Sequence, residues 1–262
     1  MLEEESKYKI GANVVASFDQ TTGSLNIYSK NGTLWTDWEE MLPIHRADIK
    51  FIKVIEGILR LPQNSAGIFQ CMTKLCEIDM RNIDTSQVRT MRDMFSSSGI
   101  IKADLSGCNL SNTIDMQGMF SGCINLTSVK IGGNGQTIPA TRLQRMFADC
   151  YQLSTVDICD CKIQEVTNMH GMFSNCLLLR SVNMTGIDTS KVIDMAHMFQ
   201  GCLSLRKIDI SHFNISGVTH INQIFYNCRN LEEVVMPVIL RKDADTADIF
   251  LKCHENLSVI SV

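Results

Sequence analysis

The chain has 262 residues, of which 45% are hydrophobic, and a formal net charge of -4 at pH 7. The hydrophobic content is ample for a core, and scattered lysine and arginine give no basic face, which excludes nucleic acid as the expected partner. No run of 18 or more apolar residues occurs, so membrane insertion as a helix is excluded too.

The N-terminus, MLEEESKYKIGANVV, is acidic where a signal peptide carries basic residues, and no apolar segment follows it. The chain is therefore expected in the cytoplasm as encoded. It is expected at the cell surface or outside the cell if it is a fragment of a longer exported protein.

Residues 12–19 and 24–29 are predicted to be two strands, joined by the turn QTTG into a β-hairpin. Trp35 and Trp38 follow, and we expect their large rings to cover the open end of the first coil rather than to stack on a ligand. We therefore predict an N-terminal hairpin cap over residues 1–48 and a solenoid of about eight coils over residues 49–262.

Phenylalanine recurs along the rest of the chain at intervals of 25 to 27 residues. A fixed period of this length indicates one supersecondary unit that stacks on copies of itself and buries its apolar face against its neighbours. The phenylalanines in this register are Phe69, Phe95, Phe120, Phe147, Phe173, Phe199, Phe225 and Phe250.

Residues 179–202 form the clearest repeat and contain two periodicities. The stretch 179–184 alternates apolar and polar residues at its end, which is typical of a short strand. After it, apolar residues recur at steps of three and four, which predicts a helix of about three turns. The IDTS motif at 187–190 is expected to cap that helix through Thr189 or Ser190.

Six cysteines each follow a repeat phenylalanine by three residues, which predicts a column of reduced thiols inside the solenoid. Disulfides between adjacent coils and a metal site are less favoured alternatives. The glycine-rich stretch 131–139 is expected to be an insertion loop rather than a phosphate site, because no GK[ST] follows it. The six cysteines are Cys123, Cys150, Cys176, Cys202, Cys228 and Cys253.

The array VxxMxxMFxxCxxLxxVDIxxxDTS resembles the repeat of BspA-like leucine-rich-repeat proteins, and residues 13–38 and 49–62 are similar to that family's N-terminal cap. The resemblance implies an α/β, right-handed, leucine-rich-repeat-type solenoid with a parallel strand ladder on its concave side. It also implies a short helix per coil on the convex side, and no catalytic residues. Members are often exported adhesion or host-interaction proteins.

The outward positions of the predicted strands form a mainly polar stripe that leans acidic. We expect this concave face to bind another protein without catalysis. Its aspartates either contact the partner or only hydrogen-bond the neighbouring turn, and Asp79 with Asp104 lack the further oxygen ligands that calcium needs. The predicted partner-binding residues are Glu77, Asp79, Arg81, Lys102, Asp104, Lys130, Asp157, Asn183, Lys207, Asp209 and Glu233.

Three alternatives stay open at this stage. The first is an intracellular inhibitor or decoy that wraps one target protein, and the second, more remote, is an enzyme. The six histidines share no ligand spacing and no serine, Walker or zinc motif occurs, so no metal and no cofactor are expected. The third is self-association, because the chain ends on the strand-like stretch 254–262 with no cap.

Overall fold

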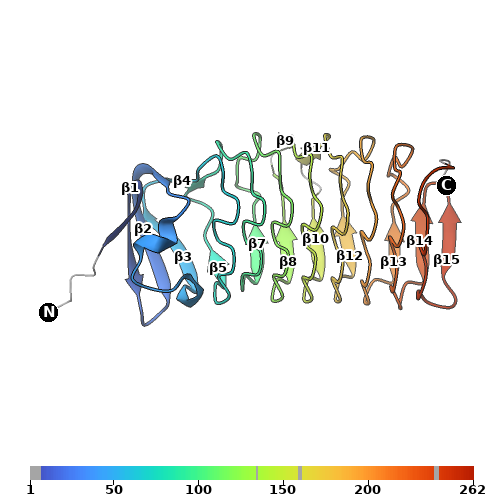
Figure 1. Ribbon diagram of the computed structural model, residues 1–262, viewed down its shortest axis with the longest axis horizontal. Helices are drawn as coiled ribbons and strands as arrows, with labels where there is room; N and C mark the ends of the chain where they lie inside the picture. Colours follow the sequence, from blue (N-terminus) through green and yellow to red (C-terminus); the bar gives the residue numbers. More distant parts are fainter. Residues whose placement is uncertain (1–6, 134, 159–160, 239–241) are drawn as a thin grey trace.

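A computed structural model describes residues 7–133, 135–158, 161–238 and 242–262. The fold is a parallel β-solenoid of about nine turns, which confirms the predicted architecture. Figure 1 shows the coils side by side in a row, from the hairpin at the N-terminal end to the last strand at the C-terminal end.

The predicted hairpin is present and is longer than expected. Strands β1 (Tyr8–Asp19) and β2 (Ser24–Leu34) pair antiparallel, and the amide of Gly23 donates to Asp19 O at 2.8 Å. Hydrogen bonds from Thr21 and Thr22 lower the pKa of Asp19 to about 2. Strand β2 also pairs parallel with β3 (Phe51–Glu56) and β4 (Leu59–Arg60), so the hairpin continues into the first coil.

Trp38 covers the start of the coil stack. It opens the 3-10 helix η1 (Trp38–Met41), is buried, and packs edge-on against Phe69 with ring centroids 6.1 Å apart. Its indole N–H donates to Ile68 O at 3.0 Å. Trp35 does not share this role, because it is half-buried and lies under the ammonium group of Lys9. A second 3-10 helix, η2 (Arg46–Asp48), leads into β3.

The remaining strands are two to four residues long. They stack in register, so that Val156 lies opposite Val129 on one side and Val182 on the other. The strands are β5 (Glu77–Ile78), β6 (Ile83–Asp84), β7 (Lys102–Asp104), β8 (Ser128–Lys130), β9 (Gln136–Ile138), β10 (Thr155–Asp157), β11 (Cys161–Ile163), β12 (Ser181–Asn183), β13 (Lys207–Asp209), β14 (Glu233–Met236) and β15 (Ser258–Ser261).

The repeat phenylalanines form a continuous stack through the core. The ring centroids of successive members lie 5.4 to 5.8 Å apart, and their planes differ by 20° or less. All are fully buried except Phe250 in the last coil, which is half-buried. The register predicted from the sequence is therefore the register of the core.

The cysteine column lies beside the ring stack. The six predicted column members are free thiols, and five of them are buried. Each column thiol donates to the carbonyl of the repeat phenylalanine one coil back, for example Cys150 Sγ to Phe120 O at 3.0 Å. Burial raises the pKa of Cys123 to about 11 and that of Cys228 to about 12.

The predicted helix in each coil is wrong. Within the described ranges the only helices are η1 and η2, and the methionine–phenylalanine segments are consecutive turns. Every second amide bonds inside its turn, as Met94 N does to Met91 O at 3.1 Å. The amides between them bond the next coil, as Phe95 N does to Met119 O at 2.8 Å. Apolar residues thus recur at steps of three and four without a helix.

Positive φ angles explain why these segments are not helical. Two positions per turn segment adopt positive φ, a region that side-chain-bearing residues rarely enter and that ends a helix. Glycine holds some of these positions, and other residues hold the rest with φ between 52° and 64°: Cys71, Asp93, Ser97, Arg145, Asp149, Asn175, His197, Gln223, Asn227, Asp248 and Lys252.

The predicted helix caps are side-chain turns instead. In the two IDTS motifs the aspartate is the acceptor, and Asp188 Oδ1 receives the amide of Ser190 at 2.9 Å. The threonine is buried and bonds the next coil, as Thr189 Oγ1 does by donating to Asn214 O at 3.2 Å. Such Asx turns bend the backbone locally, so the motif forms a corner of the coil rather than the start of a helix.

The glycine-rich stretch 131–139 is only partly a loop. Its residues 136–138 form β9, which pairs parallel with β11 on a second short ladder. Residue 134 lies outside the described residues. Residues 136–138 are therefore a strand, and the prediction of a loop does not hold for them.

Replacing Gly57 by alanine is expected to destabilise the first coil by about 1 to 3 kcal/mol, the cost of a strained backbone position. Gly57 has φ +73°, and a β-carbon there would collide with Ser29 O. Urea unfolding measures the loss. Gly107→Ala is the matched control, because no atom lies within 4 Å of its β-carbon position, and an equal loss in both variants would contradict this explanation.

Candidate partner-binding surface

The strand face is defined by the outward residues of β5, β7, β8, β10, β12, β13 and β14 and of the turns that follow them. It is the surface expected to be the concave side, and it carries all eleven predicted binding residues. Asp79, Asp157 and Glu233 are half-buried. The other eight are exposed: Glu77, Arg81, Lys102, Asp104, Lys130, Asn183, Lys207 and Asp209.

The ladder under this face is interrupted at two places. Strand β5 belongs to the N-terminal sheet, β7, β8, β10 and β12 form another sheet, and β13, β14 and β15 form the last. At intact rungs the residue after the strand donates to the next coil, as Leu105 N does to Lys130 O at 2.9 Å. Among the described residues, Met80 and Met184 have no such bond. Strand pairing is therefore interrupted between β5 and β7 and between β12 and β13.

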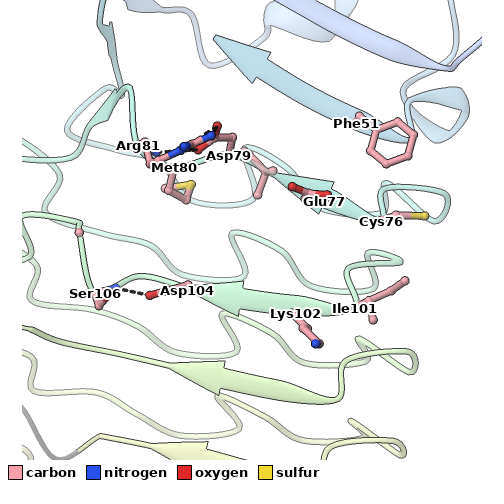
Figure 2. Close-up of a pocket in the computed structure, with 12 residues that line it drawn as sticks. Phe51, Cys76, Glu77, Asp79, Met80, Arg81, Ile101, Lys102, Asp104 and Ser106 are labelled. Carbon is pink, nitrogen blue, oxygen red and sulfur yellow. Dashed lines mark hydrogen bonds and ion pairs between the residues drawn. The ribbon is translucent and has the colours of Figure 1, made fainter.

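The first interruption opens a hollow of about 770 Å³ on the strand face. Figure 2 shows Asp79 and Arg81 on the β5 side of it, and Lys102 and Asp104 on the β7 side. Five of the eleven predicted residues line the hollow. Its remaining lining residues were not predicted: Phe51, Cys76, Ile78, Met80, Ile101, Ser106 and Gly107.

The hollow exposes residues that occupy core positions. Ile78 and Met80 are both partly exposed. The equivalent residues of the next intact coil, Val129 and Ile131, are 4% and 1% exposed. Beside them Ile101 is 42% exposed. The hollow is therefore lined by apolar side chains between its charged residues.

Ala103 gives a physical reason for the gap. It holds the inward position of β7, where β8, β10 and β12 carry valine. A methyl group in place of an isopropyl group leaves the neighbouring coil fewer atoms to pack against. The coil from Phe95 to Phe120 is also one residue shorter than most. These two features distinguish this coil from its neighbours in the sequence.

Two aspartates at the hollow are held by hydrogen bonds in their own turns. Arg81 donates from its guanidinium to Asp79 at 2.6 Å and from its amide at 3.1 Å, and these bonds lower the pKa of Asp79. Ser106 does the same for Asp104, where its amide donates at 2.9 Å and the pKa is again lowered. Both carboxylates are therefore ionised at neutral pH.

The same turn recurs along the middle column of the strand face. Asp209 Oδ1 accepts the amide of Ser211 at 2.9 Å, and Asn183 Oδ1 accepts that of Thr185 at 3.4 Å. This favours the turn-forming interpretation of the aspartates. Glu77, Lys102 and Lys130 have neither turn bonds nor ion pairs with described residues, so they are the least constrained charges.

The structure offers little to a metal ion. Within the part of the chain that the structure describes, no cluster of three or more histidine, cysteine, aspartate or glutamate side chains could hold one. None of its helices is long and apolar enough to cross a membrane. The last strand, β15, exposes all four of its residues, and self-association through it stays a prediction.

One family model matches most of the chain. It is described as "Mycoplasma protein of unknown function, DUF285" and covers residues 63–134 and 141–261. No curated protein matches. Among solved structures, the chain is similar to a leucine-rich cell surface protein from Faecalibacterium prausnitzii, at 15% identity and TM-score 0.30, over 100% of this chain and 96% of that one.

Two further solved structures are leucine-rich repeat proteins. One, from Eubacterium ventriosum, is 13% identical with TM-score 0.29 over 97% of this chain and 96% of that one. The other, from Bacteroides ovatus, is 13% identical with TM-score 0.25 over 95% of this chain and 98% of that one.

Proposed function

This chain belongs to the DUF285 family, a repeat family found in BspA-like proteins, and we propose that it is a non-catalytic scaffold that binds a partner protein through the strand face. The observation that supports this most is the face itself. Its outward side chains stand in register on successive coils, and it spans roughly 30 Å at about 4.8 Å per rung. A surface of that length suits a protein segment better than a small molecule.

The electrostatics of the face favour binding over catalysis. A general acid or base that works near neutral pH needs a pKa moved toward 7. The shifts at Asp79, Asp104 and Asp209 all go down, which keeps these groups ionised. Two forms of the function remain, an adhesion or host-interaction protein and an intracellular inhibitor of one target. They differ in the compartment of the partner.

The test is an affinity pull-down with the full chain as bait, from lysate of the source cells and from extracellular matrix proteins. A second bait carries Glu77→Lys and Glu233→Lys, which reverse two acidic charges of the strand face and leave every turn bond in place. We expect one stoichiometric partner that the second bait loses by tenfold or more, on the order of 1.4 kcal/mol of binding free energy.

A control bait carries Glu40→Lys and Glu165→Lys, which produce the same change in net charge at exposed sites outside the strand face. It should retain the partner. Equal capture by all three baits, or loss from both variants, would contradict binding through the strand face. The compartment of the captured partner separates the adhesion protein from the inhibitor.

A further inference from the structure

We propose that the hollow between β5 and β7 binds an extended, basic segment of the partner protein, with one aliphatic or aromatic side chain of that segment seated against Ile78, Met80 and Ile101. This rests on the proposed function of the strand face and adds the chemistry of the segment and the place where it anchors.

The apolar anchor follows from the opened core. Ile78 and Met80 occupy positions that are buried in the neighbouring intact coils, and Ile101 stands exposed beside them. Phe51 adds a half-buried ring at the same hollow. At about 770 Å³ the hollow is within the usual range of ligand sites. An apolar side chain placed there removes water from all four residues.

An extended backbone suits the hollow because the ladder is interrupted there. The amide of Met80 has no acceptor among the described residues, whereas its counterparts Leu105 and Ile131 donate to the next coil. An extended segment carries a carbonyl group at every residue and can supply that acceptor, as strands do when they add to a sheet. A purely apolar ligand cannot.

The charge of the surroundings selects a basic segment. The hollow is lined by three carboxylates, those of Glu77, Asp79 and Asp104, and by two cationic side chains, Arg81 and Lys102, and Arg81 forms an ion pair with Asp79 at 2.6 Å. Lys130 also lies beside Asp104, on β8. The whole face leans acidic, with six acidic and four basic residues among the eleven predicted binding residues. Lysine or arginine on either side of the anchor therefore meets complementary charge.

Three labelled peptides of equal length test the proposal by fluorescence anisotropy with the full chain. The first alternates lysine and serine around a central leucine, the second has serine in place of leucine, and the third has glutamate in place of lysine. We expect the first to bind about tenfold or more tightly than the other two, since it alone combines burial of an aliphatic side chain with complementary charge.

Two chain variants locate the site. Ile101→Ser should weaken binding of the first peptide at least fivefold, on the order of the effect of losing one apolar contact. Ile193→Ser is the matched control, because Ile193 is 51% exposed outside the hollow, and it should have no effect. The double variant Glu77→Gln, Asp104→Asn should weaken binding as well, and its asparagine keeps an acceptor for Ser106 N. Circular dichroism checks that all variants are folded.

Each contrary result overturns a stated part. Equal binding of the first peptide and the serine-centred peptide would show that no apolar side chain is anchored in the hollow. Tighter binding of the glutamate peptide would show that the hollow does not prefer a basic segment. Equal losses of affinity for the first peptide in Ile101→Ser and Ile193→Ser would show that the peptide does not bind in the hollow. If no peptide binds while the pull-down partner is lost by the strand-face variant, this inference fails and the proposed function stands.

Discussion

Replacing Phe173 by alanine is expected to lower the free energy of unfolding by about 3 to 5 kcal/mol, the usual cost of truncating a buried aromatic ring. Phe173 is fully buried, and its ring stacks on Phe147 and on Phe199 at 5.4 Å each. The substitution leaves a cavity in the middle of the ring stack and removes two aromatic contacts at once. Because each coil packs only on its neighbours, the loss falls on the interface that joins the two halves of the array.

Urea unfolding followed by circular dichroism measures this loss. The matched control is Phe250→Ala in the last coil, where the ring is half-buried and has one stacking partner, Phe225, at 5.8 Å. Its loss should be less than half as large. Equal losses would show that the stack does not stabilise the solenoid in the way its geometry indicates.

Raising the pH above 9 is expected to destabilise the folded chain steeply under reducing conditions. Burial raises the pKa of Cys108 and Cys123 from 9.0 to about 11. A thiol whose folded pKa lies above its unfolded pKa binds its proton more tightly in the folded state. Its contribution to stability is complete below pH 9 and is lost as the pH rises from 9 toward 11. Each such thiol removes about 1.4 kcal/mol per pH unit in that window.

Urea unfolding at a series of pH values from 7 to 10.5 tests this expectation. Stability should be nearly flat to pH 8.5 and then fall. Cys123→Ala should make the slope above pH 9 shallower by about 1.4 kcal/mol per pH unit. Val166→Ala, a fully buried truncation with no titrating group, should leave the slope unchanged. A slope that Cys123→Ala does not alter would show that the buried thiols are not the cause.

The stacked architecture could be predicted from the sequence because the core repeats. One phenylalanine per 25 to 27 residues places one ring per coil, and Cys150 three residues after Phe147 places a thiol beside it. The strands could be predicted for the same reason, since each alternates around a buried residue such as Val156. Repetition turns a weak local pattern into a strong one.

The turn segments could not be predicted from apolar spacing alone. Steps of three and four fit a helix, and they fit consecutive turns equally well. The distinguishing signal lay between the apolar residues: Gly118 and Gly171 stand at the position where Asp93 and Arg145 adopt positive φ. A glycine or aspartate that recurs in that column is evidence against a helix.

The charged residues of the candidate site could be predicted, and its shape could not. The outward columns follow directly from strand alternation, which placed Glu77 and Lys102 on one face. The hollow depends on how two coils pack, which a residue pattern does not state. Ala103 indicates looser packing only when it is compared with the valines at the same position of the following strands.

The ring stack also fixes the spacing of surface residues along the solenoid axis. Each phenylalanine stacks on the ring of the next coil, with 5.4 to 5.8 Å between successive ring centroids, so the coils advance along the axis by a nearly constant step. Equivalent surface residues are therefore separated along the axis by a whole number of coils. Glu77 and Glu233 are six such steps apart, and no change of surface residue alters that spacing. The buried rings therefore set the spacing along the axis, and the surface residues determine which chemical groups stand at each step.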